Sequence, residues 1–572
     1  MMTENLTFNL TSDPWIKVLD KQTGTTKTVS LTDLFSNAQN YRRLAGDTRS
    51  QDFAILRFLL AIVHTVYSRV GLSGEAYSWL EVDSKTFQVL NTEDAEDGSI
   101  DEWLQTWDDL YVTGQFSNAI IQYLEGNSAL FDLFGPHPFY QVTTEDYDSF
   151  VPEKKKVATG TGTVAVKQIN RVVSESANSP AIFAPKAGSF KNRLTLAEIT
   201  RWLITYQNYT GVTDKTKIDT SEKFSTPGGW AYRLNSVYAP GQSLFETLML
   251  NFVVNPERKN ETPIQRPVWE YNNISDYVEL RKSLLQPTNL AALYTTWSRL
   301  LHIEWQENGQ PTIFSAGIPM FSQDNLFLEP MTTWREDKQA KDGSKKPATK
   351  GTGSLGIAMW RNFGDYVSDK TVKDSHEPGI VDWLNQLVGK DLIDDDKTIY
   401  LNSIALVSDG NATSQSPVAE VFDYMGLNAD VLFDDKEELR WPNRINGVID
   451  TTQKVARQYW QFTTRIADIR NLDSRSFSSR ETGKFYDRLN EPFKQWLVSL
   501  KNNDDREVKI EEWYHELRDV VNQSVDIFER SSTPRDHHGK SLKKNADERE
   551  KPMNIFIAEN NLRAQVNSIL FG

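Results

Sequence analysis

Aspartate and histidine residues that could support hydrolytic chemistry stand together at one place in the chain, the triplet Asp536, His537 and His538. These side chains bind divalent metal ions in phosphoesterases and nucleases, where the metal activates a water molecule. The triplet lies in a polar, charge-rich stretch between two expected helices, and no second Asp/His cluster completes a metal site. We therefore interpret it as a solvated loop and keep a metal-dependent phosphoesterase or nuclease as the alternative function.

Other catalytic signatures are missing from the sequence. The 572 residues include 7 histidines and no cysteine, which excludes disulfides, thiolate nucleophiles and zinc sites that use sulfur. No histidine pair has metalloprotease spacing, and neither a phosphate-binding loop nor a nucleophile elbow occurs. The Gly-Thr-Gly-Thr run at 160–163 lacks the Lys that a nucleotide-binding loop requires, so we interpret it as a basic loop. The sequence thus offers few of the convergent polar groups that an enzyme needs, and none of these motifs predicts a cofactor or a metal.

Residues 154–193 form a nearly single-signed basic segment, with eight basic residues against one acid. Glycine and serine in the segment allow close backbone approach, and an aromatic residue could stack on a base, which together suit a nucleic-acid backbone. Composition by itself supports a nucleic-acid contact and an ordinary surface loop equally. The candidate contact residues are Lys154, Lys155, Lys156, Lys167, Arg171 and Phe183.

A second basic group occurs at residues 454–488, where eight basic residues outnumber four acids. The candidates for DNA contact there are Lys454, Arg457, Arg465 and Arg470. The chain as a whole carries a net charge of −15, which argues against a protein that coats DNA by bulk electrostatics. Taken alone, this group is typical of a solvated helical face.

The pattern of expected helices, strands and loops predicts two domains of an α+β protein. Residues 1–426 mix short strands, helices and long loops, which is typical of a large mixed α/β body. Residues 427–572 are helical throughout, and apolar side chains three or four apart predict a C-terminal four-helix bundle. Its helices are expected within 445–470, 484–500, 510–528 and 553–570. The apolar run 53–67 is too short to span a membrane, so it predicts a buried helix. With no signal peptide, we expect a cytoplasmic protein.

Several short motifs occur in an order that resembles the large subunit (CasA) of the type I-E CRISPR surveillance complex, Cascade. Each motif is degenerate, but together they cover essentially the whole chain. They are FNLTSDPWIKV, FDLFGPHPFYQV, LAEITRWLITYQNYTG, GGWAYRLNSVYAPGQSLFETLMLNFV, QRPVWE, EPMTTWR and GIAMWRNF, followed by the helical C-terminal region.

The resemblance implies a non-catalytic subunit that binds nucleic acid. Members of that family contact the 5′ handle of the crRNA and recognise the protospacer-adjacent motif (PAM) in double-stranded DNA through its minor groove. They promote strand separation and R-loop formation, bind the backbone and small subunits of Cascade, and recruit a separate helicase-nuclease. No membrane contact is implied.

The resemblance also assigns positions to these roles. The basic segment with Phe183 is similar to the family loop that contacts the crRNA handle. Gly211, with Lys215 and Lys217, occupies the place of the minor-groove loop, which has several glycines in other members. The run Ser414, Gln415 and Ser416 occupies the place of the wedge that displaces the first target base pair.

The chain departs from the family pattern at a third DNA-contacting position. Residues 313–328 contain no lysine where the family inserts a lysine finger into the minor groove. Either another residue such as Gln323 replaces the finger, or the PAM preference differs. The cysteine-rich segment of some members is also missing, so no zinc is implied.

Overall fold

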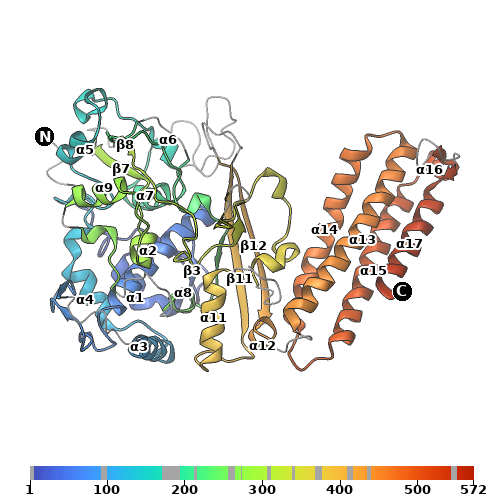
Figure 1. Ribbon diagram of the computed structural model, residues 1–572, viewed down its shortest axis with the longest axis horizontal. Coiled ribbons are helices and arrows are strands. Elements are labelled where there is room, and N and C mark those ends of the chain that lie inside the picture. Colours follow the sequence, from blue (N-terminus) through green and yellow to red (C-terminus); the bar gives the residue numbers. More distant parts are fainter. Residues whose placement is uncertain are drawn as a thin grey trace. The chain divides into compact units, whose positions relative to one another are not determined.

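The computed structural model describes the chain apart from residues 1–5, 92–99, 170–192, 212–215, 255–263, 272, 306–310, 338–339, 341, 368–376, 409–416, 435–439 and 543–550. The chain divides into two compact units (Figure 1). Unit 1 consists of Met1–Leu355, Glu377–Gln386 and Leu401–Asp423, and unit 2 of Gly356–His376, Leu387–Tyr400 and Tyr424–Gly572. The chain passes between the units within α11 (Gly379–Gly389), β11 (Thr398–Ser408) and β12 (Pro417–Asn428).

A buried helix, α2 (Arg49–Tyr67), forms the centre of unit 1. The Thr48 hydroxyl caps it by accepting a hydrogen bond from the Gln51 backbone N–H, and nearly every residue that follows is buried. Helices α7 (Leu196–Tyr209) and α10 (Leu290–Tyr294) pack against it. The buried helix predicted at 53–67 is therefore confirmed, because tertiary contacts surround α2 on every face.

The strands of unit 1 form small antiparallel sheets around these helices. Strand β1 (Ile16–Asp20) pairs with β2 (Thr26–Val29) and β3 (Tyr41–Leu44), and β7 (Arg299–Trp305) forms a hairpin with β8 (Pro311–Gly317). Strand β11 lies between β12 and β6 (Ser236–Tyr238). This mixture of short sheets and helices confirms the α+β class. The shorter elements are α1 (Leu31–Asn37), β4 (Glu81–Val82), β5 (Val89–Asn91), α3 (Ile100–Thr113), α4 (Asn118–Gly126), α5 (Thr144–Phe150), α6 (Val166–Ile169), α8 (Leu244–Asn251), α9 (Ile274–Lys282), β9 (Trp334–Glu336) and β10 (Lys345–Pro347).

Four long helices dominate unit 2 and confirm the predicted bundle. They are α13 (Trp441–Arg470), α14 (Ser474–Ser499), α15 (Arg506–Arg530) and α17 (Ile555–Phe571), visible in orange and red in Figure 1. Helix α13 packs on α14 and α17, and α15 packs on the same two helices. Aromatic side chains fill the interior: the ring centroids of Tyr459 and Phe485 lie 4.6 Å apart.

Smaller elements complete unit 2. They are the 3-10 helix η12 (Met359–Asp365), α12 (Ala429–Leu432), α16 (Pro534–His538), β13 (Lys540–Leu542) and β14 (Lys551–Met553). The Trp360 ring of η12 stacks on Phe493 of α14, with centroids 4.2 Å apart. None of the described helices combines the length and the apolar character needed to cross a membrane.

Candidate nucleic-acid interface

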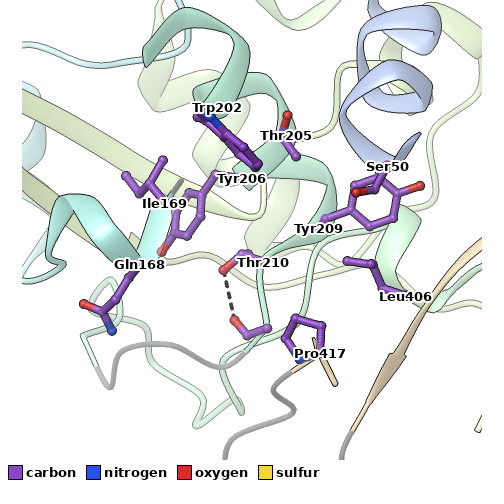
Figure 2. Close-up of a pocket in the computed structure, with 11 residues that line it drawn as sticks. Ser50, Gln168, Ile169, Trp202, Thr205, Tyr206, Tyr209, Thr210, Leu406 and Pro417 are labelled. Atoms are coloured by element: carbon purple, nitrogen blue, oxygen red, sulfur yellow. Dashed lines mark hydrogen bonds between the residues drawn. The ribbon is translucent and has the colours of Figure 1, made fainter. Parts of the chain in front are cut away.

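One pocket in unit 1 brings together the described flanks of three segments singled out in the sequence (Figure 2). Its lining includes the last described residues before 170–192, the residue before 212–215 and the residue after 409–416. The pocket is open to solvent, and its empty space of about 370 Å³ includes that open part. It is lined by Ser50, Gln168, Ile169, Trp202, Thr205, Tyr206, Tyr209, Thr210, Gly211, Leu406 and Pro417. One described flank of the basic segment, of the expected minor-groove loop and of the expected wedge therefore lies at this pocket.

Gly211 is held in place through its backbone carbonyl. The Thr210 hydroxyl donates to that carbonyl at 3.0 Å (Figure 2), and the buried Arg299 guanidinium donates to it at 2.9 Å. The backbone N–H of Gly229 donates to the Thr210 carbonyl at 2.8 Å. The backbone at the start of the expected minor-groove loop is thus held in place by hydrogen bonds within the protein.

Arg299 was missed by the sequence analysis. It begins β7 and is fully buried, and its Nη1 also donates to the Pro227 carbonyl at 2.8 Å. The Gln207 side chain on α7 binds the backbone of Arg299 twice: it accepts a hydrogen bond from the Arg299 N–H and donates one to the Arg299 carbonyl. The only local signal is an arginine within an otherwise apolar strand pattern, which does not reveal its partners.

Strand β8 anchors two of the three segments. The Thr163 hydroxyl donates to the Ser315 carbonyl at 2.9 Å, and Val164 forms a bridge with Ile313. At the other end of the strand, Lys217 forms a parallel bridge with Gly317. The basic segment and the expected minor-groove loop therefore share one structural support.

Gly162 shows why glycine is needed at this support. Its φ is +64°, and a Cβ there would lie 2.9 Å from the Ile313 carbonyl oxygen. Only glycine meets both conditions without strain. The Gly-Thr-Gly-Thr run at 160–163 is thus partly a tight packing feature against β8, in addition to lying in the basic segment.

The lysines at the start of the basic segment differ in their contacts. Lys154 and Lys155 are exposed on the 3-10 helix Glu153–Lys155. The Lys156 ammonium group contacts the Glu153 carboxylate at 2.7 Å, and hydrogen bonding to that carboxylate raises the pKa of Lys156. Lys167 lies on α6, beside the pocket-lining Gln168. Two exposed lysines thus remain as the clearest cationic surface in the described part of this segment.

Lys217 is engaged within the protein. Its Nζ donates to the Phe224 carbonyl at 2.6 Å and lies 5.1 Å from the centroid of the Phe224 ring. An outward contact would require this hydrogen bond to break. Sequence reasoning could not foresee this, because the local pattern gives no sign of the turn that brings Phe224 back to Lys217.

A carboxylate fixes the start of β12 beside the pocket. Glu420 accepts hydrogen bonds from the backbone N–H groups of Arg49 and Ser50, at 3.1 and 2.9 Å, and from the Ser50 hydroxyl at 2.5 Å. Helix N-termini present unpaired N–H groups and a partial positive charge, so an anion is stabilising there. The contact holds Pro417, which directly follows Ser416 in sequence, near the first turn of α2.

Several predicted contact residues lie outside the described part of the chain. They are Arg171 and Phe183 of the basic segment, Lys215 of the expected minor-groove loop, and the wedge residues Ser414, Gln415 and Ser416. Gln323, considered as a substitute for the lysine finger, is half-buried in unit 1.

The basic candidates on the bundle divide into two kinds. Lys454 and Arg457 are exposed on α13, and Arg465 is half-buried. Arg470 forms a two-bonded ion pair with Asp536, with Nε to Oδ1 at 2.9 Å and Nη2 to Oδ2 at 3.0 Å. Arg470 therefore has a structural role at the end of α13.

The ion pair with Arg470 also engages the aspartate of the Asp-His-His triplet. The fully buried Asp536 carboxylate also accepts from the backbone N–H and the hydroxyl of Thr533, capping α16. His537 hydrogen-bonds Ser532 and lies on Phe556. Within the residues that the structure describes, no group of three or more His, Asp or Glu side chains could hold a metal ion. The geometry gives no support to the phosphoesterase alternative, and the expected solvated loop is instead a short capped helix.

The fold is similar to that of several solved structures, three of which follow, each matched over nearly its full length. Thermobifida fusca Cse1 gives a TM-score of 0.77 at 21% identity, covering 100% of this chain and 99% of that one. Thermus thermophilus CasA (Cse1) gives 0.64 at 17%, covering 98% and 99%. A structure titled CRISPR RNA-guided surveillance complex gives 0.64 at 14%, also covering 98% and 99%.

Sequence comparison agrees with the fold. No curated protein sequence shows a significant match. The model of the family described as CRISPR-associated protein Cse1 matches residues 9–524. The chain therefore belongs to the Cse1 (CasA) family, which confirms the resemblance to the large subunit of type I-E Cascade that its motif order indicates.

Proposed function

We propose that the chain is a non-catalytic subunit of an RNA-guided surveillance complex that recognises the PAM in duplex DNA and starts strand separation. One observation carries the proposal: the flanks of the basic segment, the Gly211 loop and the wedge segment line a single pocket. A protein that reads DNA and opens it at the same point needs these parts within a few base pairs of each other. Family membership supports the same role.

The proposed reading is through the minor groove. That groove distinguishes mainly A·T from G·C pairs, so a reader there accepts several related PAMs. Gly211, clamped by Arg299 and Thr210, offers a fixed backbone from which the loop contacts the groove. Because Lys217 is engaged with Phe224, we assign the backbone a larger share of this contact than the lysine.

Strand separation is assigned to Gln415. A side chain inserted under the PAM unstacks the first target pair at a cost of a few kcal/mol, which pairing to the crRNA then offsets. The Glu420 contact with the first turn of α2 gives the wedge segment a rigid base on its C-terminal side. A rigid base matters because a flexible wedge would yield before the base pair opens.

Two further contacts complete the proposal. The exposed Lys154 and Lys155, with Arg171 and Phe183, contact the crRNA 5′ handle. On the bundle, the exposed Lys454 and Arg457 contact DNA, with the half-buried Arg465 as a further candidate. The backbone and small subunits and a helicase-nuclease are the proposed protein partners, and the cytoplasm is the proposed location.

The test compares crRNA-bearing complexes that contain wild-type chain, the Gln415→Ala variant, or no chain. Each is offered target duplex with a randomised PAM, and a second target whose first base pairs are already mismatched. Gln461→Ala, an exposed glutamine on α13, is the matched control.

We expect wild type to enrich a small set of PAMs, and Gln415→Ala to lose roughly 10- to 100-fold in R-loop formation on the duplex. The mismatched target should restore the variant, since its pairs are already open. Equal binding with and without the chain would refute the proposed role. Equal R-loop formation by wild type and Gln415→Ala would refute the wedge assignment.

A further inference from the structure

A second pocket in unit 1 is formed by two sequence motifs to which the proposed function gives no role. Residues 136–143, most of which belong to the FDLFGPHPFYQV motif, line one part of it, and Val268 and Trp269 of the QRPVWE motif line another. The pocket is open to solvent, and its empty space of about 700 Å³ includes that open part. The described residues that line it are all different from those of the pocket in Figure 2.

The wall of this second pocket is mainly aromatic. The ring centroids of Phe139 and Tyr140 lie 4.6 Å apart, and those of Tyr140 and Trp297 lie 5.9 Å apart. Trp269 and Tyr271 add further aromatic surface. Ligand pockets are commonly of this kind, with apolar walls and a few polar groups that orient the ligand. The wall therefore suits a ligand with an apolar ring.

Two of these aromatic side chains carry a buried polar atom without a partner. Tyr140 and Trp297 are 3% and 5% exposed, and neither the Tyr140 hydroxyl nor the Trp297 indole N–H forms a hydrogen bond with the described part of the chain. Buried tyrosine and tryptophan usually find a partner for this atom, because leaving it unpaired costs free energy. Trp103 and Trp383 also have unpaired indole N–H groups, but neither lines this pocket. Here two unpaired groups belong to one pocket wall.

The backbone at both positions fixes these side chains in the wall. The Trp297 N–H donates to the Tyr277 hydroxyl at 2.9 Å, and the Trp297 carbonyl accepts from the Arg281 guanidinium at 2.7 Å. Tyr140 has a φ of +55°, in the left-handed region that bulky residues seldom adopt. Strained backbone of this kind persists only where the surrounding structure enforces it, and such residues cluster at functional sites.

Other polar side chains of the wall already have partners within the protein. The Thr143 hydroxyl donates to the Asp146 carboxylate at 2.7 Å, the Trp269 indole N–H donates to the Tyr123 hydroxyl at 2.9 Å, and the Gln141 amide donates to two backbone carbonyls.

The two groups left over are donors. An indole N–H can only donate. Burial raises the pKa of Tyr140, so its hydroxyl stays protonated and can donate as well. What the wall lacks is therefore a hydrogen-bond acceptor, and no charged partner is called for.

We propose that this pocket binds an extended, proline-containing segment of a partner protein, whose carbonyl groups accept hydrogen bonds from Tyr140 and Trp297. Proline suits the wall because its ring packs on aromatic faces, as in other aromatic-lined peptide grooves. It also has a carbonyl acceptor but no backbone N–H, so it leaves no donor of its own unpaired. Both donor atoms are buried in the free chain, so binding includes a turn of the two rings that brings the donors to the segment. The inference does not rest on the proposed function.

The test uses the full-length chain and a blocked hexaproline peptide, with a blocked Gly-Ser peptide of the same length as the control ligand. Affinity is measured by calorimetric titration for wild type, Tyr140→Phe and Trp297→Phe. Tyr77→Phe is the matched control variant, since the Tyr77 hydroxyl is partnered by the Tyr67 carbonyl and the Thr106 hydroxyl and does not line the pocket. Thermal unfolding of each variant is recorded in the same buffer.

We expect wild type to bind the proline peptide saturably and to prefer it to the Gly-Ser peptide. Tyr140→Phe and Trp297→Phe should each weaken binding roughly 5- to 10-fold, since each removes one donor. Tyr140→Phe should unfold at the wild-type temperature or higher, because an unpaired hydroxyl is removed. Tyr77→Phe should unfold at a lower temperature and bind the peptide like wild type.

Three results would overturn the inference: no saturable binding by wild type, equal affinity for the two peptides, or unchanged affinity in both pocket variants. Displacement of the proline peptide by a single-stranded oligonucleotide would overturn it as well, because the pocket would then belong to the nucleic-acid interface.

Discussion

Cationic side chains are held differently in unit 1 and in the helical bundle. In the bundle, partly exposed cations such as Lys484 and Arg563 meet acids on their own helix, Glu481 and Glu559, while Arg470 pairs with Asp536 of another element. In unit 1, Arg57 and Arg69 form almost fully buried ion pairs with acids far along the chain, Glu329 and Glu270.

This difference shows that a basic residue supports nucleic-acid binding only when its side chain is not already paired with an acid of the protein. The basic residues of the bundle look numerous in the sequence, but several of them, among them Arg470, Arg480 and Lys484, already contact acids of the bundle. Short-range pairs on exposed helices contribute little to stability and are easily exchanged.

The largest effect is expected for the long-range ion pair. Glu329→Ala leaves Arg57 buried without its carboxylate and also removes the acceptor of the Trp230 Nε1 hydrogen bond. The free energy of unfolding should fall by roughly 3–5 kcal/mol, measured by urea denaturation. The exposed Glu75→Ala should change it by less than about 0.5 kcal/mol. A loss for Glu329→Ala no larger than for Glu75→Ala would break the contrast between the two regions.

An intermediate effect is expected where the basic segment joins β8. Gly162→Ala places a methyl group 2.9 Å from the Ile313 carbonyl oxygen at a positive φ, and should cost roughly 2 kcal/mol or more. Gly160→Ala is the matched control, since Gly160 has a φ of +72° but no atom within 4 Å of the added Cβ. Its cost should be about 1 kcal/mol from strain alone. Equal costs at both positions would show that β8 does not confine the segment.

The smallest effect is expected in the bundle. Burial raises the pKa of Asp536, but hydrogen bonds from Arg470 and Thr533 outweigh it and leave the pKa below its ordinary value. A lowered carboxyl pKa adds stability at neutral pH that is lost as the pH falls through the native pKa. Asp536→Asn should cost on the order of 1 kcal/mol at pH 7 and progressively less as the pH falls below about 4.

Denaturation curves at several pH values check this expectation, and nucleic-acid binding should stay unchanged. A pH-independent difference would mean that the ion pair with Arg470 adds no stability. Loss of a metal-dependent cleavage activity in this variant would instead revive the phosphoesterase alternative.

The sequence by itself determined the features that depend on neighbouring residues. The four bundle helices follow from apolar spacing, because each helix buries one stripe against its neighbours. The buried helix α2 follows from the length of its apolar run, and the α+β class follows from the mixture of short strands, helices and loops. The family follows from the order of short motifs, whereas the wedge assignment of residues 414–416 stays a prediction that rests on the family resemblance.

Only the tertiary structure decided which side chains are available for binding and what holds them. Phe224 engages Lys217, Asp536 engages Arg470, and Glu420 fixes β12 on a helix more than 350 positions earlier in the chain. Arg299 carried no distinguishing local pattern. The physical reason is that an ionic contact depends on distance in space and on burial, and neither is written in the spacing of residues along the chain.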